Sequence, residues 1–181
     1  MSPMHTVAAL ALAQAVSGAM DLAGRPVDPL HDPAARLSVL VFVQADCPLS
    51  NRYAPEVQRL QERFKPQGVV FWLVYPDATE TADTVRRHLQ EYGHRSNAAR
   101  DPGLVLVRKA KARVTPEAAV FGPDERLLYH GRIDDRYPEI GRARAAASSH
   151  DLEAALEAAL AGRTLAQEEA PAVGCFIADL E

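Results

Sequence analysis

Two continuous runs of apolar residues, rich in β-branched and aromatic side chains, dominate the first half of the chain. These runs, Leu37–Val43 and Gly68–Tyr75, lack the alternation of a half-exposed strand. They are typical of strands that are buried on both faces of a sheet. Pro116–Phe121 and Arg126–Ile133 are two further strand-forming segments, and the turn residues Gly122–Glu125 between them predict a β-hairpin.

Helical spacing predicts the elements around these strands. Pro55–Phe64 and Asp151–Leu160 place apolar residues on one face, Glu80–Tyr92 follows a threonine cap signal, and Pro102–Arg113 is a weaker helical segment. The tail from Thr164 onwards is expected to be irregular. Alternating strands and helices predict parallel strands joined by right-handed crossovers, with the hairpin as an antiparallel edge. We therefore expect an α/β protein with a central mixed sheet and helices on both faces.

Length and composition fit one soluble globular domain. The chain has 181 residues, of which 48% are hydrophobic and 24% are charged. Its formal net charge is -4, and its basic residues are scattered rather than gathered into a block. The nearest approach to a cluster, Arg108–Arg113, fits a solvated helix face. We therefore expect no nucleic-acid partner, and the oligomeric state stays open.

Residues 1–19 form either an N-terminal helix or a signal segment. Val7–Val16 is apolar and Ser17–Ala19 could serve as a cleavage site, but no Lys or Arg precedes the apolar run and Gln14 interrupts it. The run is too short to span a membrane. We divide the chain into this segment and a domain at residues 20–181, and a cytoplasmic or an exported, periplasmic location remains open.

The position of Cys47 is the most informative chemical feature. The two cysteines, Cys47 and Cys175, are too few for a disulfide scaffold and form neither a CxxC pair nor a zinc-type pattern. Cys47 follows a buried strand and precedes a helix, and Pro48 suits the first helical turn. Unpaired backbone N–H groups and the positive end of the helix dipole favour a thiolate there. The pattern therefore favours a reactive thiol over an inert buried one.

Leu40–Glu56 (LVFVQADCPLSNRYAPE) resembles the active-site segment of thioredoxin-like proteins of the redoxin, or AhpC/TSA, group. Val114–Pro116, followed by a strand, resembles the segment that holds the cis-proline loop of that fold. Three more segments resemble a particular bacterial branch of the group: Tyr129–Tyr137, His150–Leu152 and Gly174–Ile177. The resemblance implies a thioredoxin-like fold and a redox or antioxidant activity.

The resemblance also implies roles for single residues. Cys47 corresponds to the attacking cysteine, and Pro116 to a cis-proline beside it. The backbone of Thr115 is then available to pair with a bound peptide or partner. Cys175, far downstream in the tail, has three possible roles: a distal resolving thiol, one half of a structural disulfide, or an unpaired packed thiol.

Departures from related families leave the chemistry open. Thioredoxins have a second cysteine where this chain has Ser50, and such a site cannot resolve its own mixed disulfide locally. Gln44 occupies the place of a hydroxyl residue in peroxiredoxins, and Arg113 lies near their arginine but outside its pattern. Asn51 occupies the place of the second cysteine of copper-chaperone thioredoxin folds.

Several polar residues around these motifs could have a functional or a structural role. Arg52, on the first helical turn, could stabilise a thiolate or an oxygen anion, or could be a surface arginine. Asp46 would raise the pKa of the Cys47 thiol if its carboxylate faced the sulfur. Asp134–Arg136 is expected to be a structural ion-pair and turn cluster, and His88 is expected to be exposed or structural.

Two classes of function follow. The first is a thiol-dependent oxidoreductase, in which Cys47 attacks a disulfide or, in a peroxiredoxin-like variant, a peroxide, and Cys175 resolves the intermediate. Its partners would be a redox partner protein or the disulfide or peroxide substrate, and no cofactor or resident metal is expected. The second is a non-catalytic module that uses Cys47 to hold a partner protein or a soft metal.

Overall fold

The computed structural model describes residues 18–166, 168–178 and 180. Almost all of the predicted N-terminal helix or signal segment lies outside this range. The elements are β1 (Leu37–Phe42), α1 (Pro48–Phe64), the short 3-10 helix η1 (Lys65–Gln67), β2 (Val69–Tyr75), α2 (Ala82–Glu91), β3 (Asn97–Arg100), α3 (Val105–Ala110), β4 (Val114–Thr115), β5 (Glu117–Phe121), β6 (Leu127–Gly131), α4 (Asp151–Leu160), β7 (Glu169–Ala170) and β8 (Cys175–Phe176).

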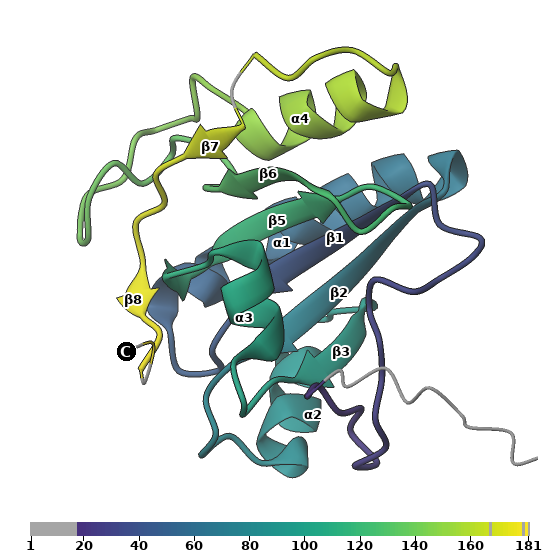
Figure 1. Ribbon diagram of the computed structural model, residues 1–181. Helices are drawn as coiled ribbons and strands as arrows, with labels where there is room; N and C mark the ends of the chain where they lie inside the picture. The colour runs from purple at the N-terminus through teal and green to yellow at the C-terminus, as the bar shows by residue number, and fades with distance from the viewer. Residues whose placement is uncertain (1–17, 167, 179, 181) are drawn as a thin grey trace, which may run out of the picture.

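A six-stranded mixed sheet forms the centre of the fold, in the order β3-β2-β1-β5-β6-β7 (Figure 1). β1 is parallel to β2, in register from Leu37 opposite Val69 to Phe42 opposite Val74, and antiparallel to β5. The β5–β6 hairpin forms as predicted. The predicted α/β class with a central mixed sheet is confirmed.

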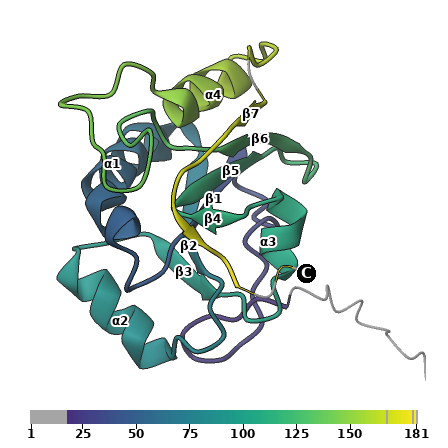
Figure 2. The same cartoon turned by 90° about the vertical axis from the view of Figure 1, so that its left-hand side faces the viewer.

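Helices cover both faces of this sheet. Side chains of β1 alternate between two cores: Val39 and Val41 pack with α1 and α4, whereas Leu40 and Phe42 pack with α3. Figure 2 shows the same division, with α1 and α3 on opposite sides of the strands. Burial on both faces explains why the β1 segment is continuously apolar rather than alternating.

Two expectations for the middle of the chain need correction. Asn97–Arg100 was not predicted as an element, yet it forms β3 and pairs in parallel with β2. The helix expected over Pro102–Arg113 is only six residues long, Val105–Ala110. It begins there because the buried carboxylate of Asp101 accepts hydrogen bonds from the backbone N–H groups of its first three residues, at 2.8 to 3.0 Å.

The tail expected to be irregular in fact contains two short strands. β7 pairs in parallel with β6, so the hairpin is not the edge of the sheet. β8 pairs antiparallel with β4, and these two strands form a separate small sheet. The tail runs along the side of the molecule from α4 to α3 (Figure 2). Among the described residues, no helix has both the length and the apolar character that crossing a bilayer requires.

Candidate active site

Cys47 lies at the N-cap of α1, where the chain leaves β1. Its backbone is extended (φ -76°, ψ 112°), Pro48 occupies the first turn, and the Asn51 N–H donates to the Cys47 carbonyl at 3.1 Å. The Cys47 side chain is 1% exposed. α1 continues from Pro48 without a break to Phe64, so the apolar spacing noted from Pro55 belongs to this one helix. The Cys47 sulfur therefore lies at the donor end of a 17-residue helix.

The segment around Pro116 forms the opposite wall of the site. The Thr115–Pro116 peptide bond is cis, the conformation that the resemblance implied. The Cys47 thiol donates to the Thr115 carbonyl at 3.2 Å, and the Thr115 hydroxyl donates to Gln44 Oε1 at 2.8 Å. Thr115 is thus bonded to the active-site loop through both its backbone and its side chain.

Cys175 lies directly against Cys47. The two sulfurs are 2.7 Å apart, and both residues are free cysteines in this structure. The β4–β8 pairing sets this position, because it places Cys175 opposite Thr115. A Cβ built on Gly174 would lie 2.2 Å from the Thr115 carbonyl oxygen, so only glycine allows this close approach of the two strands.

The two thiols differ in acidity. Burial raises the pKa of the Cys47 thiol, but hydrogen bonding with Cys175, Ser50 and Thr115 outweighs burial, and the net pKa is below the ordinary value. Burial, followed by the hydrogen bond to Cys47 and the charge of Cys47, raises the pKa of Cys175 to about 12. Cys47 is therefore the more acidic thiol of the pair and the one that forms the thiolate first, with Cys175 as its hydrogen-bond donor in that state.

Glu80 supports the loop before Cys47, and sequence reasoning did not find it. Its side chain is buried, and Oε1 accepts from the Ala45 N–H at 2.6 Å. Burial raises the pKa of Glu80 to about 7 despite this hydrogen bond. Within the described residues, Oε2 has no hydrogen-bond partner. Glu80 lies after β2, and no sequence motif marks it. Only the structure shows that its side chain is buried beneath the loop before Cys47.

A chain of three hydrogen bonds, which runs from the loop into the interior, holds the other side of Ala45. Asn51 Nδ2 donates to the Ala45 carbonyl at 3.1 Å, and Asn51 Oδ1 lies 2.8 Å from His88 Nε2. An amide oxygen only accepts, so Nε2 of His88 carries the proton, and Nδ1 accepts from the Tyr75 hydroxyl at 2.8 Å. His88 is 3% exposed and has the structural role that was one of its two expected readings.

Of the other residues singled out from the sequence, one lies beside Cys47 and three are exposed. Ser50 is buried beside Cys47, while Pro48 and the side chains of Arg52 and Arg113 are exposed. The Arg113 carbonyl accepts from the Ile177 N–H at 3.0 Å, so Arg113 holds the tail through its backbone.

The cluster expected at Asp134–Arg136 is present. Asp134 accepts from the Tyr53 hydroxyl at 2.5 Å and from the Arg136 N–H at 2.9 Å, and Asp135 accepts from Ser148 and Ser149. These bonds tie the segment after β6 to α1 and to the start of α4. The cluster has a structural role, as expected.

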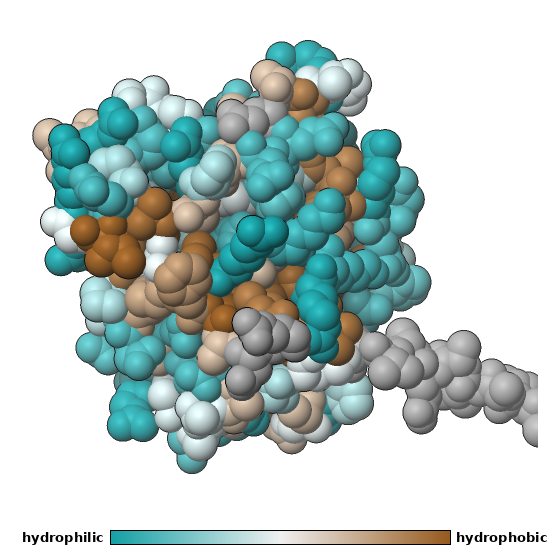
Figure 3. Space-filling model, turned by 60° about the vertical axis from the view of Figure 1, so that its left-hand side comes forward, coloured by the Kyte–Doolittle hydropathy of each residue, from teal (hydrophilic) through white to brown (hydrophobic). Residues whose placement is uncertain are grey.

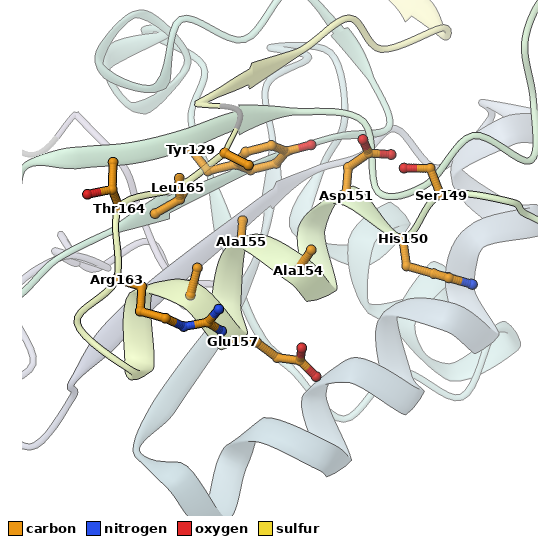
Figure 4. Close-up of a pocket in the computed structure, with 12 residues that line it drawn as sticks. Tyr129, Ser149, His150, Asp151, Ala154, Ala155, Glu157, Arg163, Thr164 and Leu165 are labelled. Atoms are coloured by element: carbon orange, nitrogen blue, oxygen red, sulfur yellow. The ribbon is translucent and has the colours of Figure 1, made fainter.

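A pocket of about 400 Å³ lies beside α4 (Figure 4). Its walls come from Tyr129, the first turns of α4 and the segment 163–166. Asp151 in this pocket is engaged by Arg132 through two hydrogen bonds, at 2.8 and 3.1 Å. Neither Cys47 nor Cys175 lines this pocket. We therefore take the Cys47–Cys175 pair, and not the pocket, as the candidate site for redox chemistry.

The fold has known counterparts among solved structures. A hypothetical protein from Sinorhizobium meliloti 1021 has a TM-score of 0.74 at 23% identity, with 87% of each chain covered. An uncharacterized conserved protein from Geobacillus kaustophilus has a TM-score of 0.74 at 24% identity, with coverage of 87% of this chain and 85% of that one.

A third counterpart carries a named activity. A secreted Mycobacterium tuberculosis disulfide oxidoreductase homologous to E. coli DsbE has a TM-score of 0.55 at 18% identity, over 77% of this chain and 93% of that one. The sequence matches no family model and no curated protein. A solved thioredoxin-like protein from Aeropyrum pernix also matches, with a TM-score of 0.56 at 16% identity. These matches establish that the chain has a thioredoxin-like fold.

Proposed function

We propose that this protein is a thiol–disulfide oxidoreductase in which Cys47 attacks a disulfide and Cys175 resolves the mixed disulfide. The observation that carries the proposal is the pair of free thiols, 2.7 Å apart, at the N-terminus of α1 and against the cis-proline segment. The likeness to solved disulfide oxidoreductases agrees with this chemistry.

In the first step the Cys47 thiolate attacks one sulfur of the substrate disulfide. A bond forms between Cys47 Sγ and that sulfur, the substrate S–S bond breaks, and the second substrate sulfur leaves as a thiolate that takes a proton from water. The lowered pKa of Cys47 supplies the nucleophile. Ser50 cannot complete the reaction, because a hydroxyl does not displace a thiolate from a disulfide.

In the second step Cys175 attacks Cys47 Sγ in the mixed disulfide. The Cys47–Cys175 bond forms, the mixed disulfide breaks, and the substrate sulfur leaves and takes up a proton. The negative charge of Cys47 is one cause of the raised pKa of Cys175. Cys47 carries no charge in the mixed disulfide, so the pKa of Cys175 falls at this stage. Its thiol is then easier to deprotonate for the attack on Cys47. An external dithiol then reduces the pair for the next cycle.

A metal site at these thiols is less favoured, because among the described residues no group of three potential metal ligands includes Cys47 or Cys175. A peroxide substrate is less favoured because the arginines that could polarise it, Arg52 and Arg113, turn their side chains to the surface.

Single-cysteine variants test the proposal. Reduced wild type, Cys47→Ser and Cys175→Ser are mixed with a small aromatic disulfide, and the products are read by mass spectrometry after acid quenching. We expect the wild type to release both aromatic thiols, Cys175→Ser to stop at a stable adduct on Cys47, and Cys47→Ser to react at the rate of an ordinary thiol. Equal rates for the two variants would contradict the assignment. Oxidation of Cys47 by peroxide far faster than by the disulfide would favour the peroxidase instead.

A further inference from the structure

We propose that the external thiol that reduces the oxidised pair attacks Cys175 Sγ, and that Cys47 is the leaving group. The mixed disulfide with the electron donor then forms on Cys175, whereas the mixed disulfide with the substrate forms on Cys47. This inference rests on the proposed function and assigns the sulfur through which electrons enter the protein.

The two cysteines differ in their access to solvent. Cys47 is 1% exposed, whereas Cys175 is partly exposed. The Cys47 sulfur contacts both the Thr115 carbonyl on β4 and the Cys175 sulfur on β8. Access is one of the factors that decide which sulfur of a disulfide a thiolate attacks. A thiolate that arrives from solvent therefore reaches Cys175, while the two short strands cover Cys47.

The disulfide itself keeps this cover in place. Beside Cys175, the Ile177 N–H donates to the Arg113 carbonyl at 3.0 Å, and the Ile177 side chain is buried in the core that contains α3. In the oxidised protein a covalent bond to Cys47 is added to these contacts, so β8 cannot move away from the site. The reduced protein has no such covalent tie. Cys47 therefore stays covered for as long as the disulfide exists.

The outer side of the tail is open. Phe176, which follows Cys175 in β8, is 83% exposed, and the tail lies at the front of the molecule in Figure 2 with no other segment in front of it. Figure 3 shows the face that carries the tail, with apolar surface between polar side chains. A donor that approaches from this side meets Cys175 before Cys47.

The acidity of the two thiols favours the same direction of attack. Attack on one sulfur releases the other, and the thiol with the lower pKa leaves faster. Burial raises the pKa of both thiols. Hydrogen bonding with Ser50 and Thr115 lowers the pKa of Cys47, and neither contact involves the partner thiol. The charge of Asp46 raises the pKa of Cys175 further. Cys47 is therefore the better leaving group.

Reduction then consists of two exchanges of sulfur bonds. The first donor thiolate forms a bond to Cys175 Sγ, the Cys47–Cys175 bond breaks, and its electron pair leaves with Cys47 as a thiolate. The second donor thiolate attacks the donor sulfur of this mixed disulfide, and Cys175 leaves and takes up a proton. The donor has become a disulfide, and its two electrons are on the protein thiols.

Mapping the first adduct tests the inference on the unmodified protein. Oxidised protein is mixed with excess 2-mercaptoethanol, quenched in acid at a series of short times and digested with pepsin, and mass spectrometry locates the adduct. At the earliest times we expect at least roughly ten adducts on Cys175 for each one on Cys47. The same reaction in urea is the control, because unfolding exposes both sulfurs. Adducts should then form on both cysteines in similar amounts.

A variant tests the cover that β8 provides. Ile177→Asp removes the apolar anchor of β8, so the share of adduct on Cys47 should rise roughly threefold or more. Gln67→Asp is the matched control, because it makes the same change of charge at an exposed position about 25 Å from Cys47 along α1. It should keep the distribution of the unmodified protein. An unchanged distribution in Ile177→Asp would overturn the role of the cover.

The outcomes separate the inference from the proposed function. An adduct that forms mainly on Cys47 of the folded protein would overturn the inference and leave the proposed function standing, since the pair would still be reduced. A pair that forms no disulfide, or a disulfide that no thiol reduces, would overturn the proposed function.

Discussion

At the scale of single residues, the two active-site thiols differ in acidity. Their sulfurs are 2.7 Å apart, and burial, the hydrogen bond to Cys47 and the charge of Cys47 raise the pKa of Cys175, so Cys47 loses its proton first. The contacts of Cys47 with the start of α1 add to the same preference. The acidity of Cys47 therefore depends on its contact with Cys175.

This dependence predicts a pH shift. The alkylation rate of Cys47 should rise with pH and level off below the ordinary range of a cysteine, about 8.5, because the lowered pKa forms the thiolate early. Cys175→Ala removes a hydrogen-bond donor and should move the midpoint to higher pH. Iodoacetamide labelling read by mass spectrometry measures both profiles. Superimposable profiles would show that Cys175 does not set the acidity of Cys47.

Glu80 predicts a pH dependence of stability. The pKa of Glu80 is about 7 in the folded protein and near 4.5 when unfolded, so the folded state holds one more proton between these values. The free energy of unfolding should therefore fall as pH rises from about 4.5 to about 7, on the order of 2 kcal/mol. Glu80→Gln should lack this part of the loss. Urea unfolding of both reduced proteins at pH 5 and pH 8 tests it, and equal losses in the two proteins would contradict it.

At the scale of elements, the site is assembled from the ends of α1, α3 and the short strands. α3 leads directly into β4, so whatever fixes the start of α3 also helps to position Thr115. The buried Asp101 carboxylate does so through three backbone N–H groups. The cap is therefore part of the support of the site, although it does not touch a sulfur.

Replacement of this cap has a predictable cost. Asp101→Ala leaves three N–H groups, two of them buried, without their partner and should lower the free energy of unfolding by about 2 to 4 kcal/mol. Asp83→Ala is the matched control, since Asp83 lies in the first turn of α2 with its side chain 85% exposed. It should change stability by less than about 0.5 kcal/mol. Chemical denaturation compares the variants, and equal effects would refute the capping role.

The elements also show what sequence patterns can reveal. β1, β2 and α4 bury long apolar stretches, so periodicity predicts them. β3 and β8 are short, and two of the four residues of β3 are polar. Each forms by pairing with the backbone of a strand that is distant in the sequence. The same limit applies to the site. Cys47 stands out through its place before a helix, whereas Glu80 and the tail position of Cys175 depend on contacts far apart in the chain.

At the scale of the whole molecule, the Cys47–Cys175 pair links the first helix to the end of the chain. A bond between them closes a loop of 128 positions. On the chain-entropy model, closing so long a loop stabilises the folded state by roughly 5 kcal/mol. The redox state of the pair should therefore be visible in global stability.

This link predicts a stability difference between redox states. Oxidised wild type should unfold at a higher denaturant concentration than the reduced protein, with a free energy of unfolding that is larger by up to about 5 kcal/mol. Cys175→Ala should unfold at one midpoint, with or without reductant. Guanidinium titrations followed by circular dichroism measure this. A reductant effect of equal size in Cys175→Ala would place its origin elsewhere.

The most direct test of the central claim is a redox titration of the two cysteines. The protein is equilibrated across a series of glutathione buffers, quenched in acid, alkylated and analysed by mass spectrometry. The account predicts that Cys47 and Cys175 convert together from two free thiols to one disulfide, in a single two-electron transition within the range of known exchange proteins. Thiols that stay free in every buffer, or a bond that no buffer reduces, would contradict it.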